Sequence, residues 1–160
     1  MSFKLGLYDQ KSEEEEVKMA VKQYNINSAQ FYNTAGEDKS ALPIIPAAPL
    51  LKRRLFKDIN TLKKDGLLIV FDRDRDEFLN IYFPRRDLAV AETREVWAMV
   101  LQDVKTREPR TTVKAESVKV RYVLKKEAYS RLGLVWVVYE ADVYPDDERA
   151  IPPLNIKPVL

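Results

Sequence analysis

The sequence predicts an α+β fold in which two N-terminal helices pack in a curved antiparallel sheet of about four to five strands. Helix-like apolar spacing is confined to the first part of this 160-residue chain. Side chains then alternate between apolar and polar in long runs, most clearly in Val113–Lys126 and Leu132–Tyr144. Helices followed by a meander of strands are typical of a layered α+β domain.

The first predicted helix covers Ser12–Ala35. Ser12 and Glu15 have the spacing of a capping box, and the acidic run Glu13–Glu16 suits the positive end of a helix. Gly36 is a natural stop. The apolar positions recur at helical spacing: Val17, Ala20, Val21, Tyr24, Phe31 and Ala35. We interpret the acidic run as a solvated first turn rather than as a binding site for a cation or a basic partner.

The second predicted helix begins near Pro49, because proline suits the first turn, and ends at Gly66. One face carries an apolar stripe of Leu51, Leu55, Ile59 and Leu62. The densest basic patch of the chain lies on the other faces, where the candidate anion contacts are Lys52, Arg53, Arg54 and Lys57. An amphipathic helix has a charged face in any case, so a solvated surface is the simpler interpretation.

Two short strands are predicted next, Leu67–Phe71 and Phe78–Phe83, with a solvated turn at Asp72–Glu77 between them. The alternating carboxylates of that turn resemble the first half of a calcium loop. The pattern fails because Glu77 stands where glycine is required and Phe83 where the last acidic ligand belongs. No metal or other cofactor is predicted.

The segment Leu88–Lys105 fits either a helix or a strand. We favour a strand, because the six consecutive apolar residues Val96–Leu101 suit a strand covered on both faces. A turn at Thr106–Thr112 follows. Val113–Lys126 is then a half-exposed strand.

The last predicted strand ends at Tyr144 and is apolar on both faces at its centre. Such a strand lies either deep in the sheet or under a partner. Residues 1–11 are expected to be an N-terminal extension, residues 12–144 a single α+β domain, and residues 145–160 a proline-rich extended tail. The apolar tail residues, among them Ile151 and Leu154, are expected to dock on the body or on a neighbour.

Composition excludes several chemistries. The chain has no histidine and no cysteine, so the usual catalytic triad, disulfides and thiolate metal sites are all excluded. With 27 basic and 25 acidic residues the net charge is +2, which does not predict nucleic-acid binding. Met1–Gln10 lacks the features of a signal peptide, and no apolar run is long enough to span a membrane. We expect a cytoplasmic protein or the soluble domain of a membrane-anchored extracytoplasmic protein.

The order of the elements resembles the nuclear transport factor 2-like cone, in which a curved sheet wraps around helices. The resemblance covers Ser12–Tyr144 and rests on the long first helix, the second helix ending at Leu62–Gly66, and the strands Val118–Lys126 and Trp136–Tyr144. It is closest to non-catalytic members: the C-terminal domains of plastid and cyanobacterial division proteins and periplasmic domains of type IV secretion subunits. The resemblance therefore implies an interaction domain.

Enzymatic members of that superfamily hold an Asp or His base with Tyr or acid donors inside the cone, which suits isomerase or dehydratase chemistry. Here the resemblance implies an Asp and Tyr pair. The candidates are Tyr24, Tyr32, Tyr82, Asp103, Tyr122, Tyr139 and Asp142. This enzyme, or a carrier of an apolar small molecule in the cone interior, is the alternative hypothesis.

The first hypothesis is a non-catalytic domain for protein–protein interaction or assembly. It would bury an exposed sheet face around Trp136 and Val138, most simply across a two-fold axis in a homodimer. The candidate interaction residues are Trp136, Val138, Leu134, Tyr144, Ile151 and Leu154. The third hypothesis is an anion-surface binder through the four basic residues of the second helix, although nucleic acid and direct membrane contact are not the expected partners.

Overall fold

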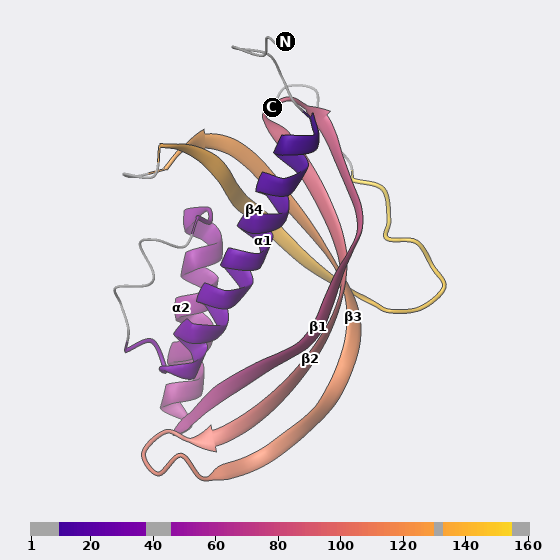
Figure 1. Cartoon of the computed structure of the whole chain (residues 1–160). Helices are drawn as coiled ribbons and strands as arrows, with labels where there is room; N and C mark the ends of the chain where they lie inside the picture. Colours follow the sequence, from indigo (N-terminus) through magenta and orange to yellow (C-terminus); the bar gives the residue numbers. More distant parts are fainter. Residues whose placement is uncertain (1–9, 38–45, 130–132, 155–160) are drawn as a thin grey trace.

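The two helices pack against one strongly curled antiparallel sheet, which confirms the predicted fold class (Figure 1). The computed structural model describes residues 10–37, 46–129 and 133–154. The elements are α1 (Gln10–Asn33), α2 (Pro49–Lys64), β1 (Leu67–Arg85), β2 (Leu88–Asp103), β3 (Pro109–Ala128) and β4 (Leu134–Pro145). The strands follow one another in the order β1-β2-β3-β4, so β1 and β4 are the edges.

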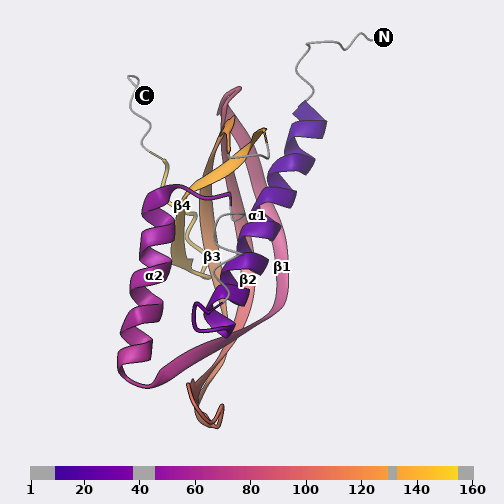
Figure 2. The ribbon, with the colours of Figure 1, turned by 90° about the vertical axis from the view of Figure 1, so that its left-hand side faces the viewer.

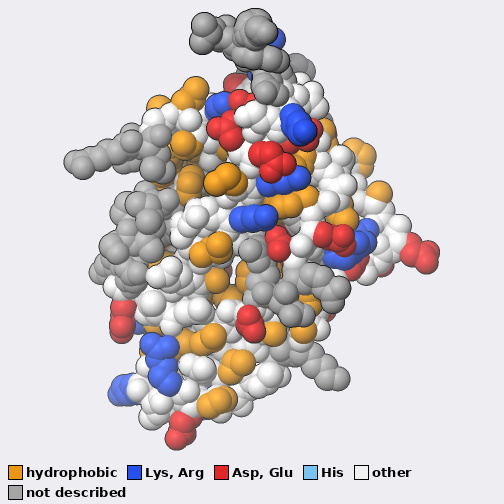
Figure 3. Space-filling view, in the orientation of Figure 1, with side chains coloured by type: hydrophobic (Ala, Val, Ile, Leu, Met, Phe, Trp, Pro, Cys, Tyr) orange, Lys and Arg blue, Asp and Glu red, His pale blue; other side chains and the backbone are white. Residues whose placement is uncertain are grey.

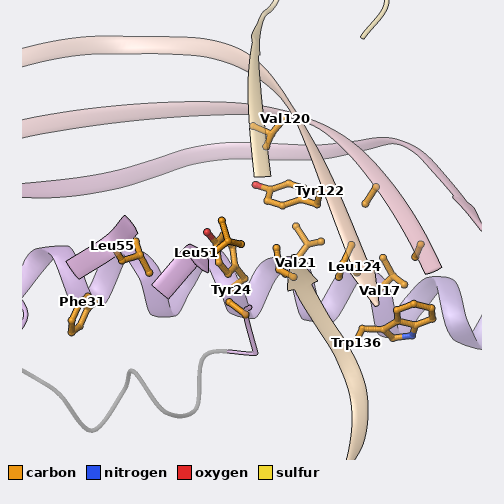
Figure 4. Close-up of a cluster of buried hydrophobic side chains, with 14 of the residues drawn as sticks. Val17, Val21, Tyr24, Phe31, Leu51, Leu55, Val120, Tyr122, Leu124 and Trp136 are labelled. Atoms are coloured by element: carbon orange, nitrogen blue, oxygen red, sulfur yellow. The ribbon is translucent and has the colours of Figure 1, made fainter. Parts of the chain in front are cut away.

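Both helices lie on the concave side of the sheet, with α1 crossing the strands and α2 beside it (Figure 2). Their apolar stripes face the inner side chains of the strands, and Figure 4 shows this core. Its fully or nearly fully buried members include Val17, Val21, Phe31, Leu51, Ile59, Ala89, Ala91, Leu124, Trp136 and Val138. Burial of these side chains is the main stabilising contribution, at ~1.5–3 kcal/mol for each large one.

The strand β2 confirms the strand interpretation of the ambiguous segment. It pairs with β1 on one side and β3 on the other. Ala89, Ala91, Thr93 and Glu95 are buried on its inner face. The buried alternation explains why a strand forms here, since a helix would have placed these residues on different sides.

The predicted pair of short strands before β2 is wrong. Leu67–Arg85 is one continuous strand, and the charged run Asp72–Glu77 lies inside it. The pairing register shifts between Arg73 and Arg75, which marks a bulge rather than a turn. The run contains no glycine, proline or asparagine to form a turn, and charged side chains with a bulge are common devices that protect an edge strand.

The strand β4 is an edge strand that the chain itself covers at its centre. Trp136, Val137 and Val138 are all buried. The Trp136 indole donates to the carboxylate of Glu13 over 2.8 Å, and Lys126 forms an ion pair with the same carboxylate. Glu13 therefore ties the start of α1 to the sheet, which differs from the solvated first turn that we expected for it.

The described tail runs over the outer side of the sheet (Figure 1), and its last residue, Leu154, lines a hollow between α2 and the edge of β4. The Arg121 guanidinium, only 7% exposed, donates to the Pro152 carbonyl over 2.5 Å and to the Tyr144 hydroxyl over 2.9 Å. Lys119 donates to the carbonyls of Asp147 and Arg149. Within the described ranges, neither helix is long and apolar enough to cross a membrane.

Candidate functional site

A pocket of about 410 Å³ lies between the two helices and the inner face of the sheet. Its walls are mostly apolar and aromatic, with a few polar groups, which is typical of a ligand site of this size. The helices supply Tyr24, Asn25, Ser28, Ala29, Tyr32, Leu51, Arg54, Leu55 and Asp58. The strands supply Phe71, Glu95, Trp97, Val118, Val120, Tyr122, Ala141 and Val143.

A buried polar network forms the floor of this pocket. The Glu95 carboxylate is 2% exposed and accepts three hydrogen bonds. Thr93 and Tyr122 donate to its Oε2 over 2.7 and 2.5 Å, and the Trp97 indole donates to its Oε1 over 2.7 Å. Asn25 of α1 donates to the Tyr122 hydroxyl over 2.9 Å. The network therefore joins β2, β3 and α1 beneath the pocket.

Tyr122 is held as a neutral phenol. Burial, followed by the nearby Glu95 carboxylate, raises the pKa of Tyr122 well above its ordinary value. Burial also raises the pKa of Tyr24, although the Ser28 hydroxyl and the Arg54 guanidinium partly oppose that rise. Both phenols thus keep their protons at neutral pH and act as hydrogen-bonding groups only.

Charged residues of α2 stand nearer the rim of the pocket. Asp58 is exposed and accepts a hydrogen bond from the Tyr32 hydroxyl over 3.0 Å. Burial and the Asp58 carboxylate together raise the pKa of Tyr32. Arg54 is also exposed and lines the same pocket one turn earlier on α2. The rim therefore offers one cation and one anion, each accessible to solvent.

The open edge of β4 borders this pocket. The segment before α2 adds to the edge at one place only within the described residues, where Ala47 bridges Val138 in parallel. There the Ala48 amide donates to the Val138 carbonyl, and the Val138 amide donates to the Pro46 carbonyl, both over 2.8 Å. The backbone groups of Val138 thus point away from β3.

Ala141 and Val143 continue this edge beyond the bridge. Their inner side chains line the pocket, and they follow a bulge at Tyr139, which is the extra residue in the pairing of β4 with β3. Because side-chain direction and backbone direction alternate together along a strand, their amides and carbonyls also point outward from the sheet. Val143 is 66% exposed although it is apolar. The edge beside the pocket is therefore open.

Among the described residues that line the pocket, the geometry supplies no free general base in its interior. Glu95 is the buried carboxylate there, and its oxygens already accept three donors. Asp58 is exposed at the rim, where its carboxylate already accepts the Tyr32 hydroxyl. The arrangement can bind and orient a ligand, whereas proton abstraction would require the network at Glu95 to be broken.

The structure brings together only part of the Asp and Tyr set that the resemblance implied. Tyr24, Tyr32 and Tyr122 line the pocket. Asp103 lies in the turn after β2, where its carboxylate accepts from the backbone amides of Lys105 and Thr106. The other three have outward side chains, as their strand positions require: Tyr82, Tyr139 and Asp142. No predicted Asp and Tyr pair forms in the pocket.

The expected exposed sheet face around Trp136 and Val138 is also wrong, because both side chains belong to the core. Leu134 is 66% exposed, and Tyr144 is half-buried against Arg121. Ile151 and Leu154 lie half-buried in the tail. Whether these last four contact a partner stays a prediction.

Of the predicted anion contacts, Arg53, Arg54 and Lys57 are exposed within about one turn of α2, and their binding of an anion stays a prediction. Lys52 is half-buried and hydrogen-bonds the Tyr129 hydroxyl, and burial lowers its pKa. Arg53 and Arg54 are exposed and line a second hollow between α2 and the β4 edge, while Lys57 is exposed further along α2. Figure 3 shows acidic and basic side chains interspersed on one face of the molecule.

Sequence reasoning missed Glu95, Trp97, Asn25 and Asp58. A signal existed for Glu95, since it shares a strand face with Thr93 and Trp97, and an acid on an apolar inner face needs partners. The strand interpretation of that segment was based instead on the apolar run Val96–Leu101, which follows Glu95. Asn25 and Asp58 carry no signal, because polar residues on a helix are usually solvated.

Comparisons with known proteins show the fold only. No protein-family model and no curated protein sequence matches this chain. Among solved structures, the chain is similar to the intermembrane space region of the chloroplast protein ARC6, with a TM-score of 0.66 and 13% sequence identity. The similarity covers 87% of this chain and 98% of that one. At this identity it supports the architecture and carries no residue roles.

Proposed function

We propose that this chain is a non-catalytic protein-binding domain that accepts an extended segment of a partner along the open edge of β4. The observation that carries the proposal is the place of Ala141 and Val143 on the edge strand β4, where both line the pocket and Val143 is 66% exposed. Strand addition to an exposed sheet edge is a common mode of peptide recognition. Its hydrogen bonds come from the backbone, and its selectivity comes from pockets for alternate side chains.

The chain already contains a short example of this pairing. Residues 46–48 add to β4 at Val138 and then leave the edge, because Pro49 begins α2. A partner strand would continue where this segment stops. Its backbone would hydrogen-bond the outward amides and carbonyls of Ala141 and Val143. These bonds would replace the hydrogen bonds that the same groups make to water in the free protein.

The pocket supports the same proposal. In neighbouring strands, side chains opposite one another lie on the same face of the sheet. Partner residues opposite Ala141 and Val143 would therefore direct their side chains inward, toward Tyr24, Trp97 and Val120. A volume of about 410 Å³ accommodates one or two large apolar side chains.

A second candidate is binding of an apolar small molecule in the pocket. The observation that favours it is the combination of apolar walls with the Tyr122 and Asn25 polar groups at the floor. Such a ligand would not need the edge of β4. The two candidates therefore differ in their dependence on the backbone at Val143.

The test is a selection of random peptides displayed on phage, with binding of the enriched peptides then measured on two variants. Val143→Pro removes an outward amide, and proline is tolerated on an edge strand when that amide faces solvent. Val143→Thr keeps the amide and a similar side-chain shape, and is the matched control. We expect the proline variant to retain its fold but to lose binding by at least ~tenfold, while the threonine variant binds nearly as the parent does.

The proposal is overturned if peptides bind Val143→Pro as tightly as the parent protein. It is also overturned if no peptide is enriched while native mass spectrometry shows an apolar molecule of a few hundred daltons bound to the purified chain. That second result would favour the small-molecule candidate.

A further inference from the structure

We infer that the pocket between the helices and the sheet binds a small organic ammonium ion, with its charge against the carboxylate of Glu95 and its apolar body among the aromatic side chains. This site lies beyond the proposed function, because an ion in the interior of the pocket does not need the edge of β4. Three features support it: a buried carboxylate, an open acceptor position on that carboxylate, and walls rich in aromatic rings.

Glu95 is a buried carboxylate whose charge has no partner cation among the described residues. It is 2% exposed, and its three hydrogen-bond donors, from Thr93, Trp97 and Tyr122, are all neutral groups. None of the ion pairs in the described part of the chain includes it. A buried charge is costly unless an opposite charge is close to it. A cation supplied by a ligand would reduce that cost.

One acceptor position of this carboxylate is still open. A carboxylate offers about four such positions on its two oxygens. Thr93 and Tyr122 donate to Oε2, and Trp97 is the described donor to Oε1. Glu95 also lines the pocket, so the remaining position on Oε1 is the one that a ligand would use. A single position suits a primary ammonium ion, whereas a metal ion needs several ligands and a guanidinium binds carboxylates through two parallel bonds.

The walls of the pocket contain five aromatic rings. They belong to Tyr24, Tyr32, Phe71, Trp97 and Tyr122. Edge-to-face contacts join them, with ring centroids 5.1 Å apart for Tyr32 and Phe71 and 5.7 Å apart for Phe71 and Trp97. The face of an aromatic ring attracts a cation within ~6 Å of its centroid, most strongly in tryptophan. Rings beside a carboxylate therefore favour an organic cation over a second anion.

The rim carries one charge of each sign and does not reverse this preference. Arg54 and Asp58 are both exposed, so water and dissolved salt screen their charges. Glu95 is buried, so its charge is screened much less. Two carboxylates against one guanidinium leave the lining of the pocket with one net negative charge. Arg54 should accordingly repel the ligand only weakly.

The test compares three small molecules that share a phenyl ring: phenethylammonium, phenethyl alcohol and phenylacetate. NMR of the indole Nε1–H groups follows their binding, because the Trp97 indole donates to Glu95 over 2.7 Å, whereas the Trp136 indole donates to Glu13. We expect the ammonium ion to bind at least ~fivefold more tightly than the alcohol, and phenylacetate to bind more weakly than either. The signal of Trp97 should move on binding, and that of Trp136 should not.

Two matched pairs of variants locate the charge. Glu95→Gln should weaken the binding of phenethylammonium by at least ~tenfold, because a charged acceptor becomes neutral. Glu92 lies on the outer face of the same strand, so Glu92→Gln makes the same change in net charge and should leave the affinity unchanged. Arg54→Gln should strengthen binding by ~twofold, because a like charge leaves the rim. Its control is Arg53→Gln, at a residue that lines the second hollow, and should have no effect.

The ammonium site is ruled out if phenethylammonium fails to bind at millimolar concentration, or binds no more tightly than phenethyl alcohol. That comparison uses the parent protein, so it holds even if Glu95→Gln does not fold. Either result leaves the edge function untouched, because peptides and Val143→Pro test that function separately. Phenethylammonium should bind Val143→Pro as tightly as it binds the parent protein. Loss of its binding in that variant would contradict a site in the interior of the pocket.

Discussion

Removing one hydroxyl from the floor of the pocket, by Tyr122→Phe, should destabilise the whole domain. The hydroxyl donates to Glu95 over 2.5 Å and accepts from Asn25 over 2.9 Å, and Tyr122 is 2% exposed. A hydrogen bond to a charged group contributes ~1.5–3 kcal/mol and a neutral one ~0.5–1.5 kcal/mol. Because the change leaves Glu95 and Asn25 each short of a buried partner, we expect a loss of ~2–4 kcal/mol in the free energy of unfolding.

Urea denaturation followed by tryptophan fluorescence measures this loss, with half-exposed Tyr82→Phe on the outer face as the control. The control should change the free energy of unfolding by less than ~0.5 kcal/mol. A double-mutant cycle with Glu95→Gln should give a coupling energy of at least ~0.5 kcal/mol, since the two groups share one network. Equal destabilisation by Tyr122→Phe and Tyr82→Phe would refute the assignment of this network as a structural support of the fold.

Three further predictions concern stability. Gly36→Ala should lower the melting temperature more than Gly133→Ala does. Both glycines have positive φ (75° and 78°), but of the two only Gly36 has a side chain, that of Ile59, 3.2 Å from the place of the new methyl group. Thermal melts of the two variants measure the difference. Backbone amides hold the pKa of Asp103 at about 2, so its stabilising effect is present above pH ~4 and lost as the pH falls toward 2. Asp103→Asn should accordingly flatten that part of the stability profile measured by urea denaturation. Burial raises the pKa values of Tyr24 and Tyr32 above those of the unfolded chain, so the free energy of unfolding should fall as the pH rises above ~10. Urea titrations in which the free energy of unfolding does not change up to pH ~12 would contradict this.

The order of the elements was predictable because the apolar residues of each long segment recur with a single spacing, either that of a helix or that of a strand. The segment Leu88–Lys105 was ambiguous, but its β-branched residues and continuous apolar run favoured the strand that the structure contains. The error at Asp72–Glu77 has a physical cause. Charged residues usually indicate a solvated turn, yet an edge strand carries them on exposed positions to prevent unwanted pairing.

The candidate site was harder to predict because it depends on contacts between distant parts of the chain. A strand such as β4, apolar on both faces, needs cover, but the sequence does not distinguish a partner from the chain itself. Here Glu13, more than a hundred residues away, supplies the acceptor for the Trp136 indole. The open edge at Ala141 and Val143 depends on where residues 46–48 leave the sheet, which no local pattern records.

The most direct test of the edge proposal is amide hydrogen exchange, followed by NMR, with and without a peptide from the display selection. Because the amides of Ala141 and Val143 point outward from an edge, they should exchange quickly in the free protein and become protected on binding. The inward amides of β4, already paired with β3, should change little. Protection that appears only in α1 or α2, with Ala141 and Val143 unchanged, would contradict strand addition at this edge.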